Sequence, residues 1–344
     1  MPTADTSPGV SLVITVLNEA ASLDPLLASL AAQTCPPAEI IVVDGGSTDG
    51  TLDVLARWRE RLPLRVLCRP GANISAGRNA GIAAATGAIV AVTDAGVRLA
   101  PDWLACLLAP FDAVAGPDAP DIVAGFFAPD PQTPFEIAMG ATVLPTLDDI
   151  APATFLPSSR SIAFRRMAWA AAGGYPEWLD YCEDLVFDLR LREQGARFAF
   201  APQAIARFRP RGSLRAFWRQ YYQYARGDGK AGLFARRHAV RYGTYAGLAW
   251  FVLRGWRLPL LWPLLLLGGA AYLRRPYARL APALPALAPG ERAGALLAVP
   301  LIRLVGDGAK MAGYPVGLRW RWRRYGRRAS WRTIGGQPRS GGRR

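Results

Sequence analysis

The sequence predicts an α/β protein built on a mostly parallel sheet and followed by a hydrophobic, helical carboxyl-terminal region. First, strand-like apolar runs alternate with helix-like stretches, and these runs cover residues 11–17, 39–44, 64–68, 88–94 and 121–127. Second, the runs are nearly all apolar, which is typical of parallel strands covered on both faces. Third, charge and hydrophobicity change abruptly after about residue 200.

The helices of the first part are expected between the strands. They are residues 22–32, 50–60, 76–85 and 101–110, the last begun by Pro101 at a first-turn position. Prolines and loops interrupt the pattern over residues 128–160. Beyond them we expect the apolar segment SIAFRR, helix 183–195, the aromatic strand 196–202 and helix 213–226. The last helix carries an aromatic and basic face, which suits a membrane surface or an anionic ligand.

The charge is divided unevenly along the chain. Residues 1–200 contain 13 Lys/Arg and 23 Asp/Glu, whereas residues 201–344 contain 28 Lys/Arg and 3 Asp/Glu. A basic surface of this kind suits nucleic acid or the anionic leaflet of a membrane.

Long apolar runs in the basic half favour the membrane, and no nucleic-acid partner is expected. They are residues 242–253, 258–273 and 293–302. The charge-free run 258–273 is shorter than the roughly 20 residues that span a bilayer, but flanking Arg and Trp can anchor its ends. Basic segments 236–241 and 319–332 then predict cytoplasmic ends with an even number of crossings. Three arginines at 274, 275 and 279 weaken this prediction, and a buried core hairpin is the alternative.

Several site types are disfavoured by composition. The first ten residues lack the features of a secretory signal. The four cysteines show no CxxC spacing, so neither a zinc site nor a disulfide framework is indicated, and a reducing cytosol fits. The single histidine, His238, lies among arginines, which disfavours Ser-His-Asp and Cys-His catalysis.

The segment IIVVDGGSTDGT, residues 40–51, raises a specific question. Its apolar run ends in Asp44, and a glycine-rich loop follows. Ligands of open α/β sheets bind beyond the carboxyl ends of strands, where a carboxylate can accept hydrogen bonds from a ribose or a base. The alternative is an ordinary turn in which Asp44 caps helix 50–60.

Four ordered segments carry a family resemblance. They are VLNEAASLDPLLASLAAQ, VVDGGSTDGT, SAGRNAGIAAATGAIVAVTDAG and YCEDLVFDLRLR. Together they resemble the family 2 glycosyltransferases, which are inverting enzymes of the Rossmann-like GT-A fold that use nucleotide-diphosphate sugars. The resemblance covers residues 11–230 and rests on the order of the motifs, because each motif alone is weak.

The resemblance implies a set of donor-binding residues. The loop after the first strand and the end of the second would hold base and ribose, and Arg78 would lie near the nucleotide, where a guanidinium pairs with phosphate. A surface ion pair is the alternative for Arg78. The implied donor-binding residues are Leu17, Asn18, Glu19, Asp44, Gly45, Arg78, Asp94 and Ala95.

The family's Asp-x-Asp motif, which binds a divalent cation, is only half present. Asp94 and Ala95 match it, but Gly96 replaces the second aspartate. One carboxylate with phosphate oxygens and waters can still hold Mg²⁺ or Mn²⁺, so Asp94 is the candidate metal ligand and metal dependence is left open.

The resemblance also implies the catalytic residues. Glu183 and Asp184 match the family's Glu-Asp pair, in which the aspartate removes the proton of the acceptor hydroxyl. Two carboxylates at a helix start also fit a helix-dipole role. Gln223 and Arg226 faintly resemble a Gln-x-x-Arg-Trp motif that binds diphosphate or acceptor, although Gly227 replaces the tryptophan.

The sequence therefore predicts three regions: a GT-A domain at 1–235, a membrane-associated helical region at 236–318, and a basic tail at 319–344 with a disordered end. The expected activity is inverting transfer of a sugar to a hydroxyl or phosphate acceptor, lipid-linked or part of an envelope glycan, at the cytoplasmic face of the cell membrane. A non-catalytic membrane assembly partner is the first alternative. A sugar nucleotidyltransferase is the second, although its glycine-rich amino-terminal signature is absent.

Overall fold

The computed structural model describes residues 9–335 apart from 115, 256, 258 and 260. The chain forms two compact units. The first, which we call the sheet unit, contains the described residues up to Ala128 together with Asp149–Phe208 and Gly335. The second, the helical unit, contains Pro129–Asp148 and the described residues of Arg209–Ile334.

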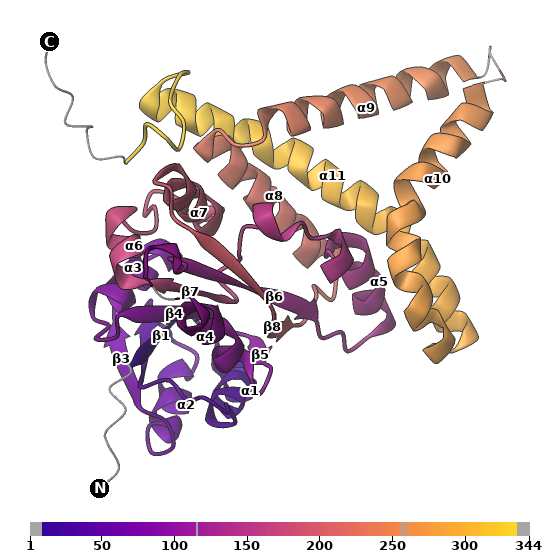
Figure 1. Cartoon of the computed structure of the whole chain (residues 1–344). Coiled ribbons are helices and arrows are strands. Elements are labelled where there is room, and N and C mark those ends of the chain that lie inside the picture. The colour runs from indigo at the N-terminus through magenta and orange to yellow at the C-terminus, as the bar shows by residue number, and fades with distance from the viewer. Residues whose placement is uncertain (1–8, 115, 256, 258, 260, 336–344) are drawn as a thin grey trace, which may run out of the picture. The chain divides into compact units, whose positions relative to one another are not determined.

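The sheet unit contains a single eight-stranded sheet with the order β3-β2-β1-β4-β7-β6-β8-β5 (Figure 1). Strands β1 to β4 are parallel to one another, and β7 pairs antiparallel with both β4 and β6. Short β5 pairs antiparallel with β8. The strands are β1 (Val10–Val16), β2 (Glu39–Asp44), β3 (Leu64–Cys68), β4 (Ile89–Asp94), β5 (Val97–Leu99), β6 (Ile122–Pro129), β7 (Ile162–Arg165) and β8 (Phe198–Phe208).

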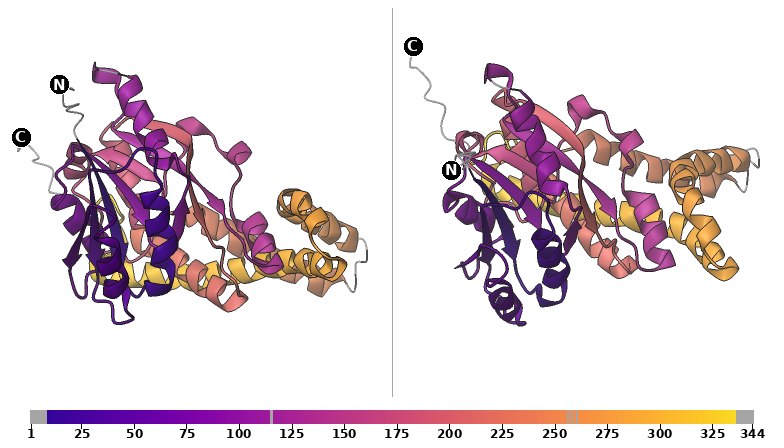
Figure 2. Two further views of the ribbon diagram at one scale, coloured as in Figure 1. Left: turned by 90° about the horizontal axis from the view of Figure 1, so that it is seen from below. Right: turned by 60° about the horizontal axis from the view of Figure 1, so that its bottom comes forward.

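Helices cover both faces of this sheet, as the sequence predicts (Figure 2). Alternation along β1 directs Leu12 and Ile14 into one hydrophobic cluster and Val13 into the other, because successive side chains of a strand point to opposite faces. Helices α1 (Ala20–Ala31), α2 (Thr51–Trp58) and α4 (Trp103–Ala113) supply the first cluster. Helices α3 (Ile74–Ala83), α6 (Arg166–Ala171) and α7 (Glu183–Glu193) supply the second.

The predicted mostly parallel α/β arrangement is confirmed, with differences in detail. Run 121–127 forms β6, whose partner is antiparallel. The expected strand 196–202 extends to Phe208. Helix α2 begins after Gly50, whose φ of +89° suits glycine, so Asp44 does not cap this helix.

The helical unit contains five α-helices among the described residues. They are α5 (Pro134–Val143), α8 (Leu214–Ala231), α9 (Ala235–Gly255), α10 (Leu261–Leu280) and α11 (Pro289–Tyr325) (Figure 1). Helices α8 and α11 pack with close backbone approach, since a Cβ atom at Gly313 or Gly317 would overlap the carbonyl of Tyr222 or Arg226. Helix α5 packs on the same unit through Ala138 and Met139, which join a cluster with Phe217.

The prediction of transmembrane helices is wrong for the described residues: none of their helices combines the length and apolar character that crossing a membrane requires. The physical reason is charge, because α9 carries Arg241 and Arg254, and α10 carries Arg274 and Arg275 within its length. Residues 319–325 belong to helix α11, and the expected disordered end at 336–344 lies outside the described residues. Position 235 falls inside the helical unit, whose second segment begins at Arg209.

Candidate active site

Two predicted carboxylates lie at the carboxyl edge of the parallel strands. Asp44 ends β2 and is paired in register with Val16, while Asp94 ends β4 and is paired with Thr15. Because β1 lies between them, the two backbones are about 10 Å apart. Pleating directs the two side chains toward opposite faces of the sheet, so a ligand must lie across the edge to meet both.

Arg78 connects three elements of the sheet unit. It lies on α3, and its Nη2 donates to Asp94 Oδ1 at 2.7 Å while its Nη1 donates to Glu183 Oε1 at 2.8 Å. The side chain is only 2% exposed, and its guanidinium lies over the ring of Tyr175 at 5.2 Å. The alternative of a surface ion pair is therefore wrong, and Arg78 joins the end of β4 to the start of α7.

Charge compensation explains how this arginine is tolerated. Burial disfavours the charged form, but Asp94 and Glu183 outweigh it and raise the pKa of Arg78 above its ordinary value. Glu183 is affected differently. Its burial and the charge of neighbouring Asp184 raise the pKa of Glu183 to about 7, although the charge of Arg78 acts to lower it. Glu183 therefore changes its charge near neutral pH.

Helix α7 places three carboxylates together. Glu183 and Asp184 begin the helix after Cys182, which has a left-handed φ of +65°. Asp188 follows Asp184 by one turn and is 1% exposed, and its Oδ2 has no hydrogen-bond partner among the described residues. Burial and the charge of Asp184 raise the pKa of Asp188 well above its ordinary value.

The loop after β1 is fastened to the loop after β2. Thr48 N–H donates to Asn18 Oδ1 at 2.8 Å, and Asn18 N–H donates to Ser47 Oγ at 2.9 Å. Glu19 N–H donates to Thr51 Oγ1 at 2.9 Å. Asn18 has a φ of +57°, a conformation that asparagine tolerates better than most residues. The predicted donor residues of these two loops are thus brought together.

Asp44 stabilises the loop that follows β2. It is 2% exposed, and its carboxylate accepts hydrogen bonds from the N–H groups of Gly46 and Ser47. Gly46 has a φ of +101° and lies against Pro70, so no larger residue fits there without strain. Leu17 is 54% exposed beside this loop, and Gly45 N–H donates to Val16 O. Base recognition by Asp44 remains a prediction.

Three residues near the site were not singled out by the sequence motifs. Arg160 Nε lies 3.7 Å from Asp94 Oδ2. The Tyr175 hydroxyl is 3.1 Å from Ser159 Oγ, and its ring stacks on Phe187. Asp188 could have been found from its spacing of four residues after Asp184, whereas Arg160 and Tyr175 carry no local signal.

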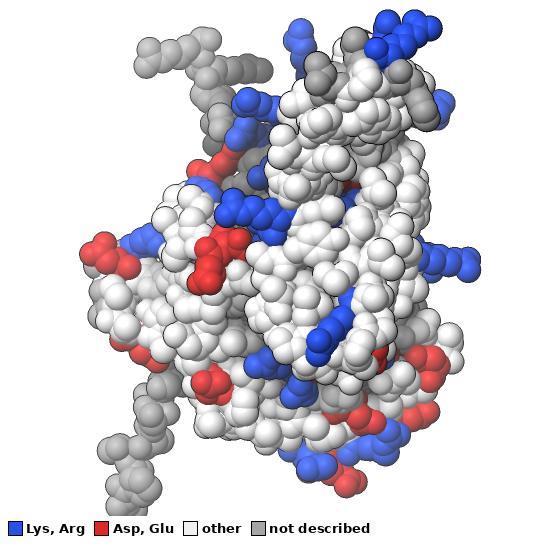
Figure 3. All heavy atoms as spheres, turned by 90° about the vertical axis from the view of Figure 1, so that its right-hand side faces the viewer, with Lys and Arg blue, Asp and Glu red and all other residues white. Residues whose placement is uncertain are grey.

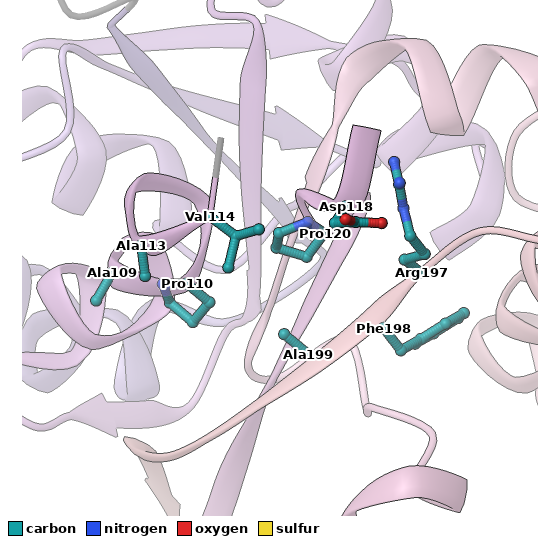
Figure 4. Close-up of a pocket in the computed structure, with 9 residues that line it drawn as sticks. All are labelled: Ala109, Pro110, Ala113, Val114, Asp118, Pro120, Arg197, Phe198 and Ala199. Carbon is teal, nitrogen blue, oxygen red and sulfur yellow. The ribbon is translucent and has the colours of Figure 1, made fainter. Parts of the chain in front are cut away.

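The sheet unit contains two hollows among its described residues. The one in Figure 4 measures about 440 Å³ and is mostly apolar, with Asp118 and Arg197 at its rim. The other measures about 670 Å³ and is lined by α3 residues such as Asn79, with Trp169 and Glu177. Neither hollow is lined by Arg78, Asp94 or Glu183. The candidate site is therefore defined by the ion pairs of these residues and not by a pocket.

Gln223 and Arg226 lie on α8, in the helical unit. Gln223 Oε1 is buried and has no hydrogen-bond partner among the described residues. Their suggested contact with diphosphate or acceptor remains a prediction.

Comparison with known proteins identifies the first part of the chain. The sequence model described as "Glycosyl transferase family 2" matches residues 11–142. Residues 11–142 are therefore similar to this family over less than half of the chain. The matched segment contains Asp44, Arg78 and Asp94, and it includes the two fastened loops.

Curated relatives support the same assignment. Validoxylamine A glucosyltransferase of Streptomyces hygroscopicus subsp. limoneus is 36% identical over 132 residues, which are 37% of this chain and 28% of the relative. An uncharacterized glycosyltransferase of Nostoc sp. is 41% identical over 88 residues, which are 25% of this chain and 27% of the relative. The chain spans less than a third of the length of these curated relatives.

A solved structure supports the GT-A fold over most of the chain. It is a mannosyltransferase from Pyrobaculum calidifontis in complex with GDP-Man and Mn²⁺. The likeness has a TM-score of 0.56 and 21% identity, and it covers 91% of this chain and 87% of the mannosyltransferase. At this identity the likeness shows the fold alone.

The family 2 metal motif is reduced here to one carboxylate. Asp94 is followed by Ala95 and by Gly96, which takes a φ of +74° in the turn to β5. No group of three or more His, Cys, Asp or Glu side chains suited to a metal ion occurs among the described residues. The Asp94 side chain is 25% exposed, and its Oδ2 lies 3.7 Å from Arg160 Nε. One carboxylate oxygen can thus join a cation whose other ligands are phosphates and waters.

Proposed function

We propose that the protein is an inverting glycosyltransferase that moves a sugar from a nucleotide-diphosphate sugar to an acceptor hydroxyl or phosphate. The supporting observation is the bridge from Asp94 through Arg78 to Glu183, because it joins the end of a family 2 strand to a Glu-Asp helix start outside the matched segment. This arrangement places charged groups at the carboxyl edge of a parallel sheet, where such folds bind their ligands.

Asp184 is the proposed general base. The acceptor oxygen attacks the anomeric carbon from the face opposite the leaving nucleotide, and Asp184 takes the proton that the acceptor loses. Glu183 is bound to Arg78, which holds the start of α7 against the end of β4. Its position next to Asp184 makes Glu183 a positioning residue in this scheme.

The donor would lie across the strand edge. Loops 17–19 and 45–51 are already fastened to each other, so a base and ribose would meet preformed loops at little ordering cost. Gly45 would allow close approach, and Arg160 would offset part of the negative charge of the diphosphate, while buried Arg78 would hold Asp94 at the strand edge. A divalent cation bound by Asp94 would stabilise the charge of the leaving diphosphate.

A donor panel tests this proposal. UDP-, GDP- and dTDP-sugars are offered to the purified full-length protein with Mg²⁺, Mn²⁺ or EDTA, and both nucleotide release and thermal stabilisation are measured. At least one donor is expected to raise the melting temperature. Asp184→Asn should lower nucleotide release by about 100-fold or more while the donor still stabilises the protein. The control is Asp180→Asn, because Asp180 is an exposed carboxylate in the segment just before α7.

Gly96 keeps one alternative open, a non-catalytic assembly partner, because the second metal-motif carboxylate is missing. This alternative predicts that Asp184→Asn leaves nucleotide release and the cellular phenotype unchanged. A donor that binds and is never released as free nucleotide would favour the alternative over the enzyme.

The helical unit suggests where the acceptor comes from. Helices α9 and α10 expose Leu253, Leu266 and Leu267 by 67% or more, and arginines lie along the same helices. The face of the molecule shown in Figure 3 is mostly white, with scattered blue and red atoms. Exposed apolar side chains with flanking cations suit the interface of an anionic membrane.

We therefore propose that these helices rest on the cytoplasmic face of the cell membrane and that the acceptor is lipid-linked or a growing envelope glycan. Flotation with vesicles is the test. The protein should float with vesicles that contain phosphatidylglycerol, and Leu266→Glu with Leu267→Glu should reduce the floated fraction. Equal flotation of wild type and variant would contradict the membrane assignment.

A further inference from the structure

A second polar cluster lies in the helical unit, away from every motif. Asp307 of α11 accepts hydrogen bonds from Arg241 Nε at 2.8 Å and from the Tyr245 hydroxyl at 3.2 Å, both on α9. It also accepts one from the Tyr272 hydroxyl on α10. Asp307 is 9% exposed. Three helices thus converge on one carboxylate.

Two further cations share this face of α11. Arg303 lies four residues before Asp307 and Lys310 three after it, so all three fall on one side of the helix. The Arg303 guanidinium lies over the Tyr272 ring at 4.8 Å, and Lys310 Nζ lies 4.8 Å from the Tyr221 ring. Neither cation forms an ion pair with a carboxylate of the described residues, and Arg303 Nε is buried without a hydrogen-bond partner there. We call Arg241, Arg303 and Lys310 the basic cluster.

The charges within this cluster do not balance. The three cations have two carboxylates near them: Asp307 accepts from Arg241, and Asp307 and Asp228 both act on Lys310, while Asp228 also contacts His238 at 3.1 Å. Burial, followed by the charge of Arg241, lowers the pKa of Lys310 to about 8. A half-buried cation without a counterion is costly, and a bound anion removes that cost.

The surroundings indicate what kind of anion fits. Along α9 the residues that follow Tyr245 include Leu248, Val252 and Leu253, all exposed to solvent. Along α10 the residues before Tyr272 include exposed Leu266 and Leu267. A ligand that joins a phosphate to a long apolar chain would match both the basic cluster and these exposed side chains.

We propose that the basic cluster binds the phosphate group of a lipid phosphate monoester whose hydrocarbon chain lies along α9 and α10. This inference rests on the proposed function, because the lipid phosphate would be the acceptor or would carry it. The tyrosines at 245 and 272 hold Asp307, and Asp307 in turn positions Arg241 toward the ligand.

Binding of farnesyl phosphate to the full-length protein in a non-ionic detergent is the test. Arg303→Gln with Lys310→Gln should weaken binding at least tenfold. The matched control is Arg274→Gln with Arg275→Gln, which removes two exposed charges of α10 and should change binding less than twofold. Farnesol, inorganic phosphate and phosphatidylglycerol are the comparison ligands, and each should bind at least tenfold more weakly than farnesyl phosphate.

Each comparison separates one explanation from the others. If farnesol bound as tightly as farnesyl phosphate, the phosphate group would not be recognised. If inorganic phosphate bound as tightly, the hydrocarbon chain would contribute nothing to binding. Equal affinity for phosphatidylglycerol would reduce the site to a headgroup contact and overturn the monoester. If the variant with both Arg303 and Lys310 changed to Gln still bound farnesyl phosphate as tightly as wild type, these residues would not form the binding site.

Stability gives an independent readout. Lys310→Met removes a poorly compensated charge, so the melting temperature without ligand should rise by about 2–4 °C while farnesyl phosphate binding falls. A cluster that only supports the fold would instead lose stability. The donor assay separates the two proposals: these variants should keep donor-induced thermal stabilisation, so a failure of donor binding in wild type concerns the sheet unit alone.

Discussion

The two units treat buried charge in opposite ways. In the sheet unit, Arg78 lies between Asp94 and Glu183, so one cation is surrounded by carboxylates of the protein itself. In the helical unit, Asp307 is the one carboxylate shared by Arg241 and two tyrosines, and Lys310 is near Asp307 and Asp228 without a close ion pair to either. The comparison teaches that carboxylates of the protein itself can neutralise a buried cation, whereas excess positive charge on a half-buried face can be neutralised by a bound anion.

The largest expected effect comes from breaking the compensated side of this comparison. Arg78→Met leaves Asp94 and Glu183 without their buried cation, and the free energy of unfolding should fall by about 3–5 kcal/mol. Denaturant unfolding measures this change. The control is Arg65→Met, because the Arg65 pair with Glu39 is half exposed and should contribute about 1 kcal/mol or less. Similar losses for both variants would mean that burial of Arg78 is energetically unimportant.

The next effect concerns the close packing of α8 and α11. Gly317→Ala should destabilise the protein by about 2 kcal/mol, because the new methyl group overlaps the Arg226 carbonyl. Gly294→Ala is the matched control on the same helix, where nothing lies within 4 Å of the added atom. Its expected result is a gain of about 0.5–1 kcal/mol from helix propensity. A gain at both positions would show that the two helices are not in contact as described.

A pH series sharpens the comparison at Glu183. Its pKa is raised from 4.5 to about 7 in the folded protein, so the folded state binds a proton more tightly than the unfolded state. The resulting stability is present below pH 4.5 and is lost as the pH rises to 7, with a slope of at most about 1.4 kcal/mol per pH unit. Glu183→Gln should flatten this decline in pH-dependent unfolding. Identical slopes for the two proteins would show that Glu183 ionises normally.

The smallest effect is expected at Asp188. Burial and the charge of Asp184 raise the pKa of Asp188 well above its ordinary value, which favours the neutral acid, and an asparagine side chain has nearly the same shape. Asp188→Asn should therefore change the free energy of unfolding at pH 7 by less than about 1 kcal/mol. Thermal unfolding checks this, and a loss of several kcal/mol would indicate an ionised carboxylate with an essential partner.

Much of the sheet unit could be predicted because its signals are local. Runs 39–44 and 64–68 coincide with β2 and β3, since a buried strand bounded by turn residues is a strong pattern. Helix α5 was missed because Pro134 was interpreted as a breaker, although proline fits the first turn after the Thr133 cap. The extension of β8 was missed because Pro202 lies inside it.

The candidate site was predictable only in part. Arg78 and Glu183 were found from their motifs, but their ion pair joins residues 105 positions apart, and no local pattern specifies it. Arg160 approaches Asp94 from a segment without any motif. The basic cluster depends on three helices meeting, and sequence spacing shows only its α11 face, where Arg303, Asp307 and Lys310 recur at helical intervals.

The chain path has a practical consequence for anyone who shortens this protein. Residues 129–148 leave the middle of the sheet-forming sequence and fold with segments that come after residue 209. A fragment that stops at 208 would thus retain α5 but lack α10 and α11, leaving Ala138 and Met139 without the side chains that bury them. Such a fragment should aggregate on expression, because it exposes the hydrophobic side chains of α5. Deleting residues 129–148 together with the carboxyl-terminal helices would remove that exposed hydrophobic surface.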